Sequence, residues 1–76
     1  MKAIVTVMLK NGVLDPQGQA ITGALQNLGF DQAQAARQGK IIELDLADGT
    51  SEDVVTDMCE KLLANTVIES YRVELV

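Results

Sequence analysis

The sequence predicts a ferredoxin-like α+β fold of the order βαββαβ, in which a four-stranded antiparallel sheet carries two helices on one face. Three observations predict it: a nearly continuous apolar run over 3–9, two segments with apolar residues at helical spacing, and two-residue alternation over 40–46 and 67–76. With 76 residues, the chain has room for one domain, spanning 1–76.

The first strand and the first helix have the clearest signals. The segment 3–9 is rich in valine and isoleucine, which is typical of a central strand buried on both faces. Asp15 followed by Pro16 predicts a helix start, with the aspartate as N-cap and the proline at the first helical position. The helix should end at Gly29. Its apolar stripe comprises Ala20, Ile21, Ala24, Leu25 and Leu28.

Residues 31–38 are ambiguous, because their local propensity favours helix. However, Gln38-Gly39 precedes the alternating segment 40–46, and this combination is typical of a hairpin turn that enters a strand. A hairpin needs a first strand, so we predict a weak edge strand over 33–38. The strand over 40–46 should then be central, beside the strand over 3–9.

A second helix and a last strand complete the predicted order. The segment 48–51 ends the preceding strand and caps the helix. The apolar stripe of this helix should be buried, and it consists of Val54, Val55, Met58, Cys59, Leu62 and Leu63. The segment 64–66 closes the helix. In the strand over 67–76, the alternation of Tyr71, Val73 and Leu75 predicts one buried face.

The composition excludes several classes of protein. The formal charge of −5 and the presence of only two aromatic residues argue against nucleic-acid binding. No apolar run approaches the roughly 20 residues of a membrane helix, and the amino terminus has no signal-peptide pattern. Cys59 is the only cysteine and there is no histidine, so we expect neither a disulfide nor a zinc site. A lone thiol suits a reducing compartment, and we expect the cytoplasm.

The small size predicts self-association. A core of this size rarely supplies more than about 3–5 kcal/mol of net stability, and oligomerisation is the remaining way to add to it. If one face of the first strand meets the helices, its other face displays Ile4 and Met8 beside Thr6, with Ile41 nearby. An apolar patch on an uncovered sheet face usually marks a contact surface, so we expect these residues to meet another copy.

No group of residues predicts catalysis or a bound cofactor or metal. Cys59 lies on an apolar stripe without a histidine to activate it, so it should be a core residue. The carboxylates at 43, 45, 52, 53, 57 and 60 alternate with apolar positions, as on a solvated face, and lack the spacing of a calcium loop. Neither helix start follows a glycine-rich phosphate loop, and acidic residues occupy both starts.

Arg37 and Lys40 flank the predicted Gln38-Gly39 turn. Two cations there could simply keep an edge strand soluble. Alternatively, they could contact an acidic surface of a partner.

Three stretches resemble one family along the whole chain. They read GVLDPQG over 12–18, RQGKIIEL over 37–44 and MCEKLLANTVIESY over 58–71. Together with the length and element order, they are similar to the PurS family, the small subunits of phosphoribosylformylglycinamidine synthase. Thr66 departs from the proline expected in many relatives.

This resemblance implies a function by assembly. The synthase converts formylglycinamide ribonucleotide, ATP and glutamine to formylglycinamidine ribonucleotide in de novo purine synthesis. A glutaminase subunit releases ammonia, and a large synthetase subunit uses it. The small subunit is expected to act as a homodimer or higher oligomer that bridges these two partners without an active site. It would bind no cofactor, while ATP, magnesium and glutamine would be used by the partners. The resemblance also implies partner contacts at Leu14, Asp15, Pro16 and Arg37.

Two other functions share the predicted fold. A small-molecule-binding regulatory module would bind a saturable ligand, and fold alone does not exclude it. A small enzyme of the acylphosphatase type would need an anion-binding loop with an arginine, which 10–14 does not supply.

Overall fold

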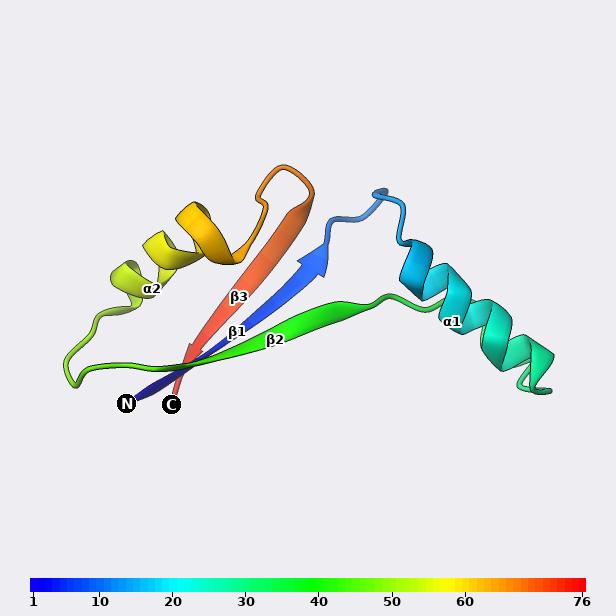
Figure 1. The fold of residues 1–76 in the computed structure, drawn as a ribbon, viewed down its shortest axis with the longest axis horizontal. Coiled ribbons are helices and arrows are strands. Elements are labelled where there is room, and N and C mark those ends of the chain that lie inside the picture. Colours follow the sequence, from blue (N-terminus) through cyan, green and yellow to red (C-terminus); the bar gives the residue numbers. More distant parts are fainter.

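The computed structural model describes all 76 residues as one sheet with a helix packed on it and a second helix held away from it (Figure 1). In chain order the elements are β1 (Lys2–Leu9), α1 (Pro16–Asn27), β2 (Gly39–Asp45), α2 (Glu52–Met58), the π-helical turn η1 (Cys59–Leu63) and β3 (Glu69–Leu75).

The sheet has three antiparallel strands in the order β2-β1-β3, so the prediction of four strands was wrong. β1 is central, as its apolar run predicted, and Val5 lies opposite Ile42 on β2 and Val73 on β3. β2 lies at an edge instead of in the centre, because the strand expected beyond it does not form. The order otherwise corresponds to a ferredoxin-like sheet that lacks one edge strand.

The missing strand is the segment 33–38, which runs as irregular chain beside α1. It contains no β-branched or aromatic residue, and alanine is depleted in strands, so little favours pairing with β2. The Gln26 side-chain amide donates to the Ala33 carbonyl at 3.0 Å, which ties the segment to α1. The Gln38-Gly39 hairpin was therefore also wrong, because Gly39 simply begins β2.

The core lies between the sheet and α2. Its fully or nearly buried hydrophobic residues come from β1 and from the α2–η1 helix, and they are Ala3, Val5, Val7, Val55, Cys59 and Ala64. The burial of Cys59 confirms that this thiol is a core residue. Ser51 caps α2 by accepting from the Val54 amide at 3.4 Å, and Glu52 and Asp53 in the first turn favour the helix dipole.

The last turn of the second helix differs from the prediction. η1 is closed by a bond from the Ala64 amide to the Cys59 carbonyl at 3.0 Å, which is one residue longer than an α-helical bond. Beside this wider turn Leu62 is 83% exposed, although the apolar stripe predicted burial. Val54 is exposed as well, because the sheet covers only the side of the helix that carries the buried Val55 and Cys59.

α1 begins and ends where the sequence predicts. The Asp15 carboxylate accepts from the Gly18 amide at 2.9 Å, and Pro16 is the first helical residue. Gly29 follows the helix with a φ of 97°, which a residue without a Cβ adopts without strain.

α1 does not cover the sheet, so the prediction of two helices on one sheet face was wrong. Residues 10–38, which we call the arm, project from the end of the sheet and carry α1 at their far part (Figure 1). The molecule measures 49 × 24 × 14 Å, with a Cα radius of gyration of 15.7 Å. A compact chain of this length would have a radius of about 11 Å.

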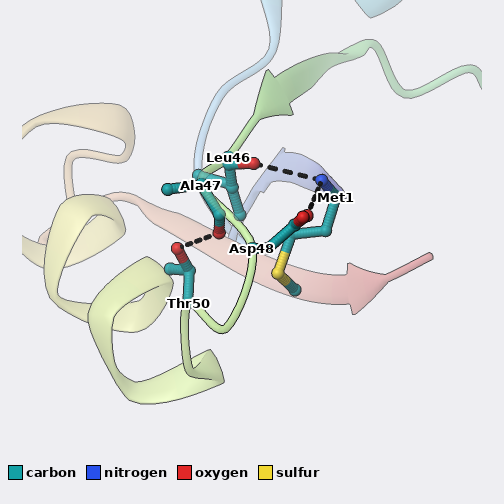
Figure 2. A network of polar contacts seen from close by, with 5 residues as sticks. All are labelled: Met1, Leu46, Ala47, Asp48 and Thr50. Carbon is teal, nitrogen blue, oxygen red and sulfur yellow. Dashed lines mark hydrogen bonds and ion pairs between the residues drawn. The ribbon is translucent and has the colours of Figure 1, made fainter.

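The connection from β2 to α2 is fixed by polar contacts at the opposite end of the sheet (Figure 2). The Met1 ammonium donates to the Leu46 carbonyl at 3.1 Å and lies 3.2 Å from a carboxylate oxygen of Asp48. The Thr50 hydroxyl donates to the Ala47 carbonyl at 2.6 Å. These contacts hold the turn that directs α2 back across the sheet.

Neither helix has the length and apolar character needed to cross a membrane.

Candidate interaction surfaces

The arm carries an apolar surface that this chain leaves uncovered. We call Ile21, Ala24, Leu25 and Leu28 the arm stripe; Leu28 is 73% exposed and Ile21 is exposed as well. Residues 16–30 contain no aspartate, glutamate, lysine or arginine. The polar side chains of α1 are all uncharged, being those of glutamine, asparagine and threonine. The exposed arm stripe is therefore a candidate contact surface.

The face of the sheet opposite α2 is a second uncovered surface. Ile4, Thr6 and Met8 line its centre along β1, and the strand register places Ile41 opposite Thr6 on the same face. Ile41 is 67% exposed. The structure thus brings together three of the predicted contact residues, and we call Ile4, Met8 and Ile41 the open-face patch.

Ion pairs border the open-face patch. The Lys2 ammonium nitrogen lies 3.6 Å from a carboxylate oxygen of Glu43, and Nε of Arg72 lies 3.6 Å from a carboxylate oxygen of Glu74. These side chains are exposed. Exposed pairs of this kind contribute about 0–1 kcal/mol to stability. An apolar centre with a charged border is the usual layout of a protein–protein interface.

The other predicted contact residues lie together at the base of the arm. Leu14 is 65% exposed and Pro16 is exposed, so both side chains are accessible to a partner. The guanidinium of Arg37 donates to the Leu9 carbonyl. Two backbone amides, first that of Gln38 and then that of Gly18, donate to Asp15 and hold the pKa of its carboxyl below the usual range.

A hollow of about 340 Å³ opens beside the arm base, on the sheet face that carries α2. Its lining includes Val7 and Leu9 from β1, Lys40 from β2 and Glu69 from β3. This hollow could not be predicted from the sequence. Its residues are separated along the chain, and only the strand pairing Val7–Lys40 and Leu9–Glu69 brings them together.

The titratable core groups do not form a catalytic arrangement. Burial, with a smaller contribution from the Glu60 carboxylate, raises the pKa of the Cys59 thiol. A thiol that stays protonated is a poor nucleophile. The carboxylates of α2 are exposed, and Asp57 pairs with Lys61 at 2.9 Å. No three aspartate, glutamate or cysteine side chains converge on a point where they could hold a metal ion.

Tyr71 and Glu60 form a polar contact that the sequence did not predict. A hydrogen bond from the phenol to the Glu60 carboxylate, together with burial and the charge of Glu60, raises the pKa of Tyr71 to about 12. The pair links β3 to the exposed side of η1. It could not be found by periodicity, because Glu60 lies on the polar side of its helix.

Alkaline titration should show this contact directly. Tyr71 is the only tyrosine and there is no tryptophan, so the ultraviolet absorbance of phenolate reports on one group. We expect a midpoint near pH 12, and we expect Glu60→Gln to lower it toward the ordinary tyrosine pKa of 10.0. Because folding favours the neutral phenol, the stability contribution is complete below pH 10 and is lost as the pH rises toward 12. An unchanged midpoint in a Glu60→Gln variant that circular dichroism shows to be folded would exclude the hydrogen bond.

Comparisons with known proteins agree on one family. The family model for PurS, phosphoribosylformylglycinamidine (FGAM) synthase, matches residues 2–76. The chain is 49% identical to the phosphoribosylformylglycinamidine synthase subunit PurS of Bacillus subtilis over 76 residues, covering 97% of this chain and 90% of the relative.

Solved structures give the same result. A crystal structure of B. subtilis PurS matches with a TM-score of 0.86 at 51% identity, covering 96% of this chain and 94% of that chain. A chain in the structure of PurLQS from Thermotoga maritima matches with a TM-score of 0.85 at 31% identity, covering 99% and 95%. Similarity this close over nearly the whole length means that the relatives share the projecting arm. The chain therefore belongs to the PurS family, the PurS subunits of phosphoribosylformylglycinamidine synthase.

Proposed function

We propose that this chain is a non-catalytic assembly subunit that associates with itself and bridges the glutaminase and ATP-dependent synthetase subunits of phosphoribosylformylglycinamidine synthase in purine biosynthesis. The observation that carries the proposal is α1 on the arm, an uncharged helix whose apolar stripe is held away from its own sheet. Short isolated helices are marginal in water, so cover from another chain would stabilise α1 further.

The surface area supports association between copies. The chain exposes 5372 Å², whereas a compact protein of 8.2 kDa exposes about 4500 Å². The excess of roughly 800 Å² is close to what one partner contributes to an interface of standard size. Only 7 of 76 residues are buried, so a single copy has little core of its own. A second copy would supply the missing cover.

The geometry favours a reciprocal contact in which the arm stripe of each copy lies against the sheet of the other. Two-fold symmetry places the same two surfaces on both sides of such an interface. The open-face patch is the proposed receiving surface, since it is the uncovered face of the sheet and has an apolar centre. The outer edge of β2 is also unpaired and would be covered by the approaching arm.

The proposed partners and cofactors follow from the family. The T. maritima relative is solved as PurLQS, a complex of PurS with other subunits. Leu14, Pro16 and Arg37 at the arm base are the proposed contacts with the glutaminase or synthetase subunit. ATP, magnesium and glutamine would be used by those subunits and not by this chain. A buried free thiol is compatible with the cytoplasm, which we propose as its compartment.

Reconstitution tests the proposal. Glutamine-dependent synthase activity of the purified glutaminase and synthetase subunits should appear when this chain is added and stay at background without it. The chain alone should be inactive. Equal activity with and without the chain would contradict the assembly role. A rise in the melting temperature of the dialysed chain with a free amino acid would then favour a ligand-binding module that uses the 340 Å³ hollow.

A further inference from the structure

Two irregular segments connect the arm to the sheet, and the carboxylate of Asp15 links them to each other. The first connection leaves β1 and ends at Asp15, and the second enters β2 through Gln38. One oxygen of Asp15 accepts from the Gly18 amide at 2.9 Å, and the other accepts from the Gln38 amide at 2.9 Å. The same side chain therefore caps α1 and holds the returning chain 23 residues later.

Other contacts at the arm base repeat this cross-link. The Gln38 side-chain amide donates to the side-chain oxygen of Gln17 at 2.6 Å. The Arg37 guanidinium donates to the Leu9 carbonyl at the end of β1. A Cβ on Gly18 would lie 2.3 Å from the Ala36 carbonyl oxygen, so the first turn of α1 and the returning segment lie too close together for any side chain at position 18. Gly18 is the only residue of α1 that is buried.

We propose that Asp15 is a positioning residue that clamps the arm base and sets the direction in which α1 leaves the sheet. α1 has no extensive packing against the sheet, so its direction depends on the two connections at its base. With both connections fixed to one carboxylate, the arm cannot turn about either of them as a free hinge. The clamp keeps α1 projecting and leaves the uncovered sheet surface open.

The clamp has a consequence for association, which rests on the proposed function. An arm that is already fixed loses less conformational freedom when it binds a second copy than a mobile arm would. The Asp15 clamp would therefore favour association without itself lying in the interface.

Asp15→Asn separates the clamp from the helix cap. Asparagine caps helices about as well as aspartate, because its side-chain oxygen can accept from the Gly18 amide. Its second polar atom is an NH₂ donor, which cannot accept from the Gln38 amide. The matched control is Asp31→Asn, which removes the same charge from an exposed aspartate of the arm that makes no hydrogen bond or ion pair.

The measurement is the distance distribution between spin labels on the arm and on the sheet connection. Asn27→Cys, at the end of α1, and Ala47→Cys, after β2, place the two labels on exposed positions. Dilution with unlabelled chain removes distances between copies, and labelling of the unsubstituted protein measures any reaction at the buried Cys59. We expect a narrow distribution for the unsubstituted Asp15 and for Asp31→Asn. For Asp15→Asn we expect a distribution at least about twofold wider, with unchanged helicity.

A second pair of variants tests the other end of the bond. Gln38→Pro removes the donor amide without changing Asp15 and should widen the distribution, whereas Gln38→Ala keeps the amide and should widen it less. A distribution that stays narrow in both Asp15→Asn and Gln38→Pro, at a concentration where sedimentation shows single copies, would overturn the clamp. A wider distribution that comes with a loss of helicity in Asp15→Asn would also overturn it, because the helix itself and not its direction would then have changed. Sedimentation of the same samples reports association separately, so failure of the clamp and failure of the proposed function are distinguishable.

Discussion

Ile21→Glu in the arm stripe should convert the associated protein to single copies at micromolar concentration while leaving α1 helical. Ile21 is exposed in one copy, so a charged side chain there costs little before association. In the proposed interface it would bury a charge where an apolar side chain contributed about 1.5–3 kcal/mol. Two-fold symmetry doubles the effect, and a loss of about 4 kcal/mol per dimer weakens Kd roughly 1000-fold.

The control for this variant lies on the same helix. Gln19→Glu adds the same charge at an exposed position outside the arm stripe, and it should leave association unchanged. Sedimentation velocity over a dilution series measures both variants, with circular dichroism as the check on helicity. If Ile21→Glu sediments as the unsubstituted protein does, the arm stripe does not lie in the interface.

Ile41→Glu on the open sheet face should also weaken self-association, by roughly 100-fold in Kd. The side chain is 67% exposed in one copy, so the sheet should tolerate the change. Each copy would lose about 1.5 kcal/mol of binding free energy from apolar burial, so the dimer would lose about 3 kcal/mol, which corresponds to the change in Kd. The same sedimentation series, together with the synthase reconstitution, measures the effect on association and on activity.

Ala47→Glu is the matched control for the open face. It introduces the same charge at an exposed position in the connection after β2, away from Ile4, Met8 and Ile41. Dissociation by Ile21→Glu together with normal association of Ile41→Glu would mean that the arm docks on a different surface. The half-buried Ile42 and Leu44 of β2, on the face that carries α2, would then be the receiving surface.

Part of the candidate surface could be read from the sequence. Alternation along β1 and β2 placed Ile4, Met8 and Ile41 on one face, and the strand register agrees with that placement. The hydrogen bond from Gln38 to Asp15 could not be found in this way, because it joins residues 23 positions apart in irregular chain. The hollow beside Lys40 and Glu69 was also missed, since no local pattern links the three strands that line it.

Local sequence signals were sufficient to predict most of the individual elements. The valine-rich run specified a central strand, Asp15-Pro16 and Gly29 specified the ends of α1, and the position of Cys59 on an apolar stripe specified its burial. Each of these depends on neighbours a few residues away. By contrast, contacts between distant parts of the chain keep 33–38 out of the sheet and make α1 project from it, and no local signal predicts either feature. An apolar stripe predicts that one side of a helix is covered. The same stripe would be found whether the covering surface belongs to its own chain or to another chain. The contacts of Asp15, Arg37 and Gly18 at the arm base decide between the two.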